Sequence, residues 1–151
     1  MRSSIFLLSI LLFSCSPEGL VSVNPTQCHN NPYIDKILDA VRYVESNDGK
    51  YVLNINRNKR GKEISRDEGE YQLNNKNMIL FANAYNDGRM YNPYNSDVAR
   101  RIARQLLLDN YNYLYNWYDA IISYNCGIGG FMKGPPDKSI VFAYKVMKAM
   151  K

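Results

Sequence analysis

The sequence DAVRYVESN, residues 39–47, places a glutamate where an amphipathic helix is expected to bury its side chains. At about 100° per residue, the apolar residues of this region fall on one stripe, as in a helix with one buried face. They are Ile34, Ile37, Leu38, Val41 and Val44. Glu45 falls inside the same stripe. Charged side chains are seldom buried without a partner or a task, so Glu45 is either an end-of-helix group that turns into water or an acid with a tuned pKa.

This helix is expected to open at Asn31-Pro32, because proline is tolerated at the first helical position, and to run to about Asn47. Residues 51–56 partly alternate between apolar and polar, and residues 58–61 are typical of a turn. A small β-hairpin or an ordered loop is therefore expected directly after the first helix.

The remainder of the chain is expected to be helical. A short helix is predicted over about residues 76–85, and Ser96 is the expected N-cap of a long one. Two later helices are indicated by the periodic residues Trp117, Ile121 and Tyr124, and by Ile140, Val141, Tyr144 and Met147. The predicted fold class is mainly α (α+β), a helical domain with one small β-hairpin or loop excursion.

The N-terminus has the layout of a secretory signal peptide. One positive charge at Arg2 precedes an apolar run that ends at Ser14-Cys15, too short to span a membrane. This end resembles a relaxed bacterial lipobox, which implies a signal peptide at residues 1–14, lipidation of Cys15 and a linker over 15–31. The alternative is a plain signal peptide with Cys15 incidental. We expect a periplasmic, membrane-anchored envelope protein whose domain covers residues 32–151.

Composition narrows the chemistry. The net charge of +5 favours acidic partners, and an exported protein meets free peptide carboxylates of the cell wall, not nucleic acid. The single histidine, His29, has no metal-spaced neighbours, so we expect no metal, no cofactor and no histidine-based nucleophile. With Cys15 assigned to lipid, Cys28 and Cys126 either pair or stay free. With metal and histidine chemistry set aside, acid–base catalysis by carboxyl side chains is the kind of chemistry that remains.

Three separated motifs carry a family resemblance. Glu45-Ser46 is followed by Gly69-x-x-Gln72 and, after a helix-like run, by Tyr124-Asn125-x-Gly127-x-Gly129. This ordered set resembles the soluble lytic transglycosylase family, lysozyme-like enzymes that cleave peptidoglycan, over about residues 33–147. The resemblance implies a lysozyme-like domain, expected to be a monomer, that acts on peptidoglycan glycan strands.

The resemblance also assigns roles. Glu45 would be the single catalytic acid/base, which requires a carboxyl that still holds a proton at neutral pH. Ser46, Gln72, Asn74, Tyr124, Asn125 and Tyr144 would bind substrate or shape the site. Each has a structural alternative: Gln72 and Asn74 can satisfy loop backbone, and Tyr124 can be a core aromatic residue with a bonded hydroxyl.

The chain also departs from the family. Glu70-Tyr71 stands where an apolar pair is usual, Cys126 replaces an alanine and Ile128 replaces a proline. These changes put subsite preference in doubt, and the altered pair leaves open a lipoprotein that binds glycan without cutting it.

Asp67 decides between two reactions. The stretch SRDEGEYQLN, residues 65–74, also resembles the part of c-type lysozymes that supplies their second carboxylate. If Asp67 faces Glu45, water can complete the cleavage and the protein is a muramidase hydrolase. If Glu45 acts alone, it closes a 1,6-anhydro ring on muramic acid, the reaction we favour. The structural alternative for Asp67 is an Asx-type turn before Gly69.

Overall fold

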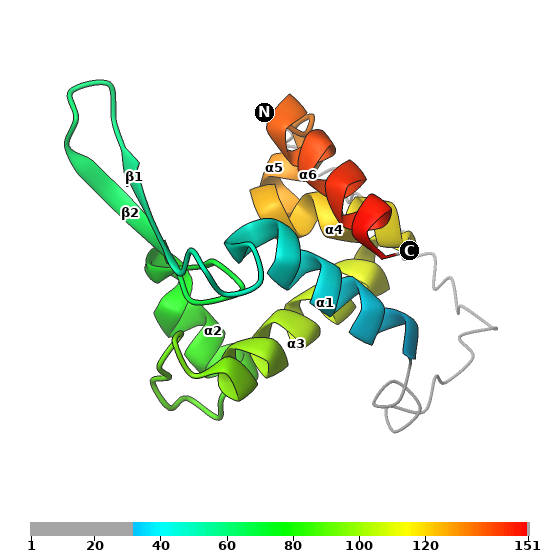
Figure 1. Ribbon diagram of the computed structural model, residues 1–151, viewed down its shortest axis with the longest axis horizontal. Helices are drawn as coiled ribbons and strands as arrows, with labels where there is room; N and C mark the ends of the chain where they lie inside the picture. Colours follow the sequence, from blue (N-terminus) through cyan, green and yellow to red (C-terminus); the bar gives the residue numbers. More distant parts are fainter. Residues whose placement is uncertain (1–31, 151) are drawn as a thin grey trace, which may run out of the picture. The chain divides into compact units, whose positions relative to one another are not determined.

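The computed structural model describes residues 32–150 (Figure 1). The expected signal peptide, Cys15, the linker and Cys28 lie outside the described residues. Within residues 32–150, no helix is both long enough and apolar enough to cross a membrane.

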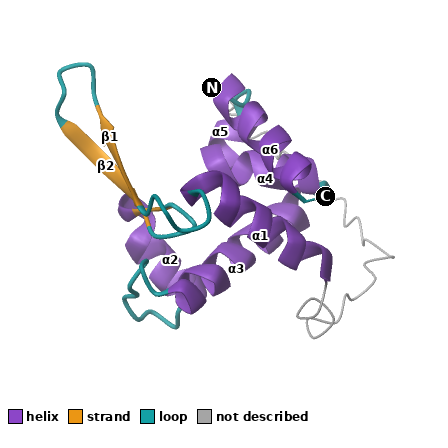
Figure 2. Ribbon diagram, in the orientation of Figure 1, coloured by secondary structure: helices purple, strands orange, loops and turns teal. Residues whose placement is uncertain are grey.

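The predicted fold class is confirmed: the described part of the chain is mainly helical with a small antiparallel sheet directly after the first helix (Figure 2). The helices are α1 (Pro32–Ser46), α2 (Met78–Tyr85), α3 (Ser96–Leu114), α4 (Trp117–Cys126), α5 (Ile128–Met132) and α6 (Asp137–Ala149), with a 3-10 turn η2 (Asn75–Asn77) before α2. The strands are β1 (Leu53–Arg57), β2 (Glu63–Glu68) and β3 (Leu73–Asn74), in the order β1-β2-β3.

The core lies where α1, α3, α4 and α6 pack against one another, with α2 on α3 and α5 on α4. The predicted apolar stripe of α1 is the face that enters this core. Ile34, Ile37, Leu38 and Val41 are fully buried. Burying such side chains contributes about 1.5–3 kcal/mol each, so this stripe fixes the rotation of α1 and with it the direction of Glu45.

The sheet is a long hairpin, β1–β2, to which the two-residue β3 adds. It extends away from the helical body (Figure 1). Asn54 pairs with Asp67, and Asp67 pairs with Asn74, so these three residues share one face of the sheet. The hairpin turn is held by Asn58 Oδ1, which accepts hydrogen bonds from the backbone N–H of Arg60 and Lys62 at 2.9 and 3.0 Å.

Three details differ from the sequence predictions. The N-cap of α3 is Asn95 and not Ser96: the Asn95 side chain accepts a hydrogen bond from the Val98 N–H. The last helix exists, but it buries Phe142, Ala143 and Val146, while Val141 and Tyr144 are 51% and 62% exposed. Helix α5 was not predicted, because two of its five residues are glycines and its pattern is too short to show a period.

Candidate active site

A large cavity of about 1050 Å³ lies between the end of α1, the sheet, α2, α3 and the start of α5. Of the residues that sequence analysis assigned to the site, Glu45, Asp67, Gln72, Asn74, Tyr124 and Asn125 all line it. These residues come from three separate segments of the chain. The fold therefore brings together most of the set that the motifs predicted, in a space large enough for a polymer of sugars.

Glu45 enters the cavity from the last turn of α1. The helix stops directly after it, because Ser46 Oγ donates to the Arg42 carbonyl at 2.8 Å and accepts from the Gly49 N–H at 2.9 Å. The chain then turns through Asn47, Asp48 and Gly49, all with positive φ, and leads into β1. Ser46 is fully buried and does not line the cavity, so its observed role is to end the helix.

The environment of Glu45 favours its protonated form. Burial raises the pKa of Glu45 from its usual value to about 7, and the negative charge of Asp67 acts in the same direction. A hydrogen bond with the Asn125 side chain has the opposite effect on this pKa. Near neutral pH, a large fraction of Glu45 therefore carries the proton that a general acid must deliver.

Asp67 lines the same cavity in a very different environment. Its Oδ2 accepts hydrogen bonds from Asn56 Nδ2 at 2.8 Å and Asn54 Nδ2 at 3.2 Å, and its Oδ1 accepts from Asn74 Nδ2 at 2.6 Å. All three partners donate, which matches an ionised carboxylate, since that group only accepts. The proposed Asx-type turn is absent, and each strand of the sheet instead supplies a residue to this cluster.

Gln72 and Asn74 combine site and loop roles. Gln72 has positive φ (48°), and its Nε2 donates to the Gly69 carbonyl at 2.9 Å. A non-glycine residue at positive φ costs about 1–3 kcal/mol and persists only where its surroundings fix it. Asn74 donates to Asp67, and its Oδ1 accepts from the Lys76 N–H at 3.0 Å to start η2. The backbone roles weighed for both side chains are present, and both residues still face the cavity.

Tyr124 and Asn125 line the cavity at the end of α4. The Tyr124 hydroxyl donates to the Tyr71 carbonyl at 2.8 Å, and its ring stacks on Phe142 at 6.4 Å between centroids. Burial raises the pKa of Tyr124 well above its usual value, and the charge of Glu45 adds to this effect. Tyr124 therefore stays a neutral phenol that ties α4 to the segment before β3.

Ser139 orients Asn125. The Ser139 hydroxyl, fully buried on α6, donates to Asn125 Oδ1 at 2.7 Å. With its oxygen engaged, Asn125 turns its amide nitrogen to the Glu45 carboxyl, where it can only donate. Sequence analysis did not select Ser139, because nothing in the pattern of α6 shows that this serine faces inward.

Tyr144 and Cys126, both named in the sequence analysis, differ in their position relative to the cavity. Tyr144 is 62% exposed on α6 and does not line the cavity. Cys126 lines it with a free thiol, whose Sγ donates to the Ile122 carbonyl at 3.4 Å.

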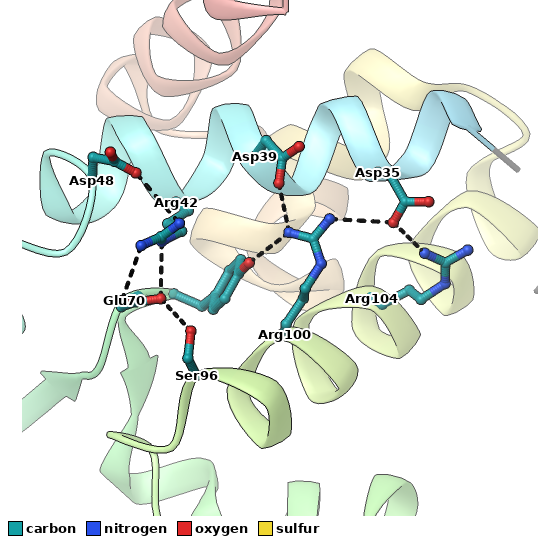
Figure 3. Close-up of polar contacts among 9 residues, drawn as sticks. Asp35, Asp39, Arg42, Asp48, Glu70, Ser96, Arg100 and Arg104 are labelled. Atoms are coloured by element: carbon teal, nitrogen blue, oxygen red, sulfur yellow. Dashed lines mark hydrogen bonds and ion pairs between the residues drawn. The ribbon is translucent and has the colours of Figure 1, made fainter. Parts of the chain in front are cut away.

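Glu70 and Tyr71, two of the residues at which the chain departs from the family, form a clamp between α1 and α3 (Figure 3). Glu70 Oε1 accepts a hydrogen bond from Arg42 Nη2 on α1 at 3.2 Å, and the ion pair brings Arg42 Nε within 2.9 Å of Glu70 Oε2. The same Oε2 accepts from Ser96 Oγ on α3 at 2.6 Å. Tyr71 is 1% exposed, and its hydroxyl accepts from Arg100 at 2.9 Å. Neither side chain lines the cavity, and the unusual pair instead joins the sheet to α1 and α3.

Arg100 and Arg104 extend this clamp along α1. Arg100 pairs with Asp39 at 2.6 Å and with Asp35 at 3.3 Å, and Arg104 pairs with Asp35 at 2.6 Å (Figure 3). Gly69 lets this segment lie close to Pro93, because the Cβ of any other residue would lie 1.9 Å from the Pro93 carbonyl oxygen and clash with it. The helix that carries Glu45 and the segment that carries Gln72 are thus held to the same face of α3.

Sequence analysis also missed Asn54 and Asn56. Their alternation along the predicted strand was the available signal, since residues two apart share a face of a strand. Tyr85, Asp109 and Lys138 line other parts of the cavity. Among residues 32–150, no group of three or more His, Cys, Asp or Glu side chains is arranged to hold a metal ion.

Comparisons with protein-family models, curated proteins and solved structures found no match for this chain.

Proposed function

We propose that this protein is a peptidoglycan lytic transglycosylase with Glu45 as its single acid/base. The observation that carries the proposal is the desolvated Glu45, whose pKa of about 7 keeps a large fraction of it protonated near neutral pH, in a large cavity that Asp67 also lines. Cleaving a glycosidic bond requires a proton on the departing oxygen, and Glu45 supplies it.

The reaction proceeds in two proton transfers at one residue. Protonated Glu45 donates to the oxygen between N-acetylmuramic acid and N-acetylglucosamine, and the bond from that oxygen to muramic acid C1 breaks. The resulting Glu45 carboxylate removes the proton from the C6 hydroxyl of the same muramic residue, and O6 bonds to C1. No water is consumed, the product is 1,6-anhydromuramic acid, and Glu45 ends protonated as it began.

The remaining residues of the site bind the substrate and stabilise the charges that develop during the reaction. Asp67, held by three amides, presents a negative charge to the positive charge that develops at the sugar ring. Asn125 holds the Glu45 carboxylate after the first transfer. Gln72, Asn74 and Tyr124 line the space where the N-acetyl sugars would bind.

A muramidase hydrolase remains a second candidate, because Asp67 lines the same cavity as Glu45 and raises its pKa. In that case water, and not the C6 hydroxyl, attacks C1. The third candidate, a protein that binds glycan without cutting it, rested on the altered Glu70-Tyr71 pair. Glu70 and Tyr71 do not line the cavity, which favours an enzyme over this third candidate.

Digestion of purified cell wall by the unmutated protein tests the proposal, with Glu45→Gln as the matched control. Release of soluble muropeptides by the unmutated protein, and not by the variant, is the expected result. A failure to release muropeptides at any pH between 5 and 7 would contradict every enzymatic function proposed here.

The proposed location follows from the N-terminal sequence alone. We propose that Cys15 is lipidated and anchors a monomeric domain to an envelope membrane next to its wall substrate. Cys15→Ala should give a protein without acyl chains, as mass spectrometry would show.

A further inference from the structure

The tip of the β1–β2 hairpin carries a concentrated positive charge. Residues 57–62 include four cations, Arg57, Lys59, Arg60 and Lys62, and no acidic residue. All four are exposed, and the hairpin extends away from the helical body (Figure 1).

These charges are uncompensated within the described part of the chain. None of the four forms an ion pair with a carboxylate of residues 32–150. Glu63, the nearest acid along the hairpin, is already paired with Arg66 at 2.6 Å. By contrast, Arg42, Arg100 and Arg104 are all paired where they hold α1 to its neighbours. The positive field of the tip is therefore directed outward.

The tip is also continuous with the cavity. Arg57 and Ile64 line the cavity together with Asn56, which binds Asp67. Arg57 ends β1, and Lys59 and Arg60 lie in the turn that directly follows it. A polymer bound at Asp67 and longer than the cavity would reach this tip.

We infer that the hairpin tip binds the carboxylates of the peptide stems on the substrate strand, so that the protein prefers peptide-bearing glycan to glycan stripped of peptides. This inference rests on the proposed function, because it takes the occupant of the cavity to be peptidoglycan. The glycan backbone presents N-acetyl and hydroxyl groups to the cavity, whereas the stems supply the anionic groups that match exposed arginine and lysine. The continuity of the tip with the cavity favours the strand over a separate anionic surface.

Binding, measured apart from cleavage, tests the inference. The full chain with Cys15→Ala and Glu45→Gln, which removes the lipid anchor and the acid, is sedimented with beads that carry intact wall and with beads that carry wall stripped of stems by an amidase. Beads are used because stripped strands are no longer cross-linked and do not sediment by themselves. We expect about five- to tenfold tighter binding to intact wall at low salt, the size expected of a few exposed ion pairs. This preference should shrink as salt screens the charges.

Charge variants assign the preference to the tip. Replacing three tip cations (K59Q/R60Q/K62Q) should abolish the preference for intact wall. The control K36Q/K145Q/K148Q removes the same charge from exposed positions on α1 and α6 and should keep the preference. The charge-conserving variant K59R/K62R should also keep it, and circular dichroism verifies that each variant is folded.

Three results would overturn the inference. They are equal binding to intact and stripped wall, an equal loss in the tip and control variants, and tip-dependent binding to vesicles with phosphatidylglycerol in place of wall. None of them bears on the proposed reaction, which is tested separately by the release of muropeptides and by the chemistry of their ends.

Discussion

Glu45 and Asp67 face one cavity from two elements whose surroundings differ. Glu45, at the end of a buried helix stripe, has lost water and receives one amide hydrogen bond, and its pKa is raised to about 7. Asp67, on the middle strand of a polar sheet, receives three amide hydrogen bonds. The difference teaches that the surroundings, and not the residue type, give a carboxyl its part in the site: burial raises the pKa of Glu45, and amide donors of the sheet fix the orientation of Asp67.

The largest effect should follow from removing the acid. In Glu45→Gln the side chain is uncharged and has nearly the same shape as protonated Glu45, but it cannot donate a proton to the leaving oxygen. We expect a loss of about 10²–10⁴-fold or more in the rate of muropeptide release, since the one residue serves as both acid and base. An activity within tenfold of the unmutated protein would remove Glu45 from the reaction.

The same substitution should raise stability at high pH. A carboxyl with a raised pKa binds its proton more tightly in the folded state, so its contribution to stability is present below about pH 4.5 and is lost as pH rises toward about 7. Urea unfolding at pH 8 should therefore show Glu45→Gln more stable than the unmutated protein by about 1–3 kcal/mol, with the gap closing near pH 4.5. A gap that does not change with pH would mean that Glu45 is not desolvated.

Removing the second carboxylate should have a smaller effect on rate. Asp67→Asn should slow muropeptide release by roughly tenfold or less, about 1.4 kcal/mol of barrier, if Glu45 alone transfers protons. Because the charge of Asp67 raises the pKa of Glu45, its removal should also move the loss of activity at high pH to a lower pH. A complete collapse of activity would instead favour Asp67 as a partner in hydrolysis.

The smallest effect is expected at Ser139, and its direction is opposite. Ser139→Ala frees the Asn125 oxygen, so the amide is no longer directed at Glu45. Because that hydrogen bond lowers the pKa of Glu45, its loss should move the high-pH limit of activity upward, with a rate change of only a few-fold. A shift in the same direction as Asp67→Asn would contradict this orientation of Asn125.

The sequence alone predicted the parts of the fold in which apolar residues recur at a regular spacing or turn residues mark a boundary. The stripe of α1 predicted its buried face and singled out Glu45, and turn residues predicted the hairpin. The inward face of α6 could not be predicted, because both of its faces carry apolar residues and only packing against α1 and α4 selects one. For the same reason, the sequence did not predict that Ser139 faces inward.

The site was predictable only where a motif named its members. Glu45, Gln72, Asn74, Tyr124 and Asn125 came from motifs, and they line one cavity. Asn54 and Asn56 required the register of β1 on β2, which depends on the bulge between Asn56 and Arg57. Glu70 looked like a change within the site, and only the tertiary contacts with Arg42 and Ser96 reveal it as part of a clamp.

The chemistry of the product tests the central claim most directly. Cell wall is digested in water enriched in oxygen-18, and the released muropeptides are analysed by mass spectrometry. If Glu45 alone performs both proton transfers, the products end in 1,6-anhydromuramic acid and carry no label, because the C6 hydroxyl is held next to C1 at an effective concentration that bulk water does not match. Reducing ends that carry one oxygen-18 would contradict this account and assign the protein to the hydrolases.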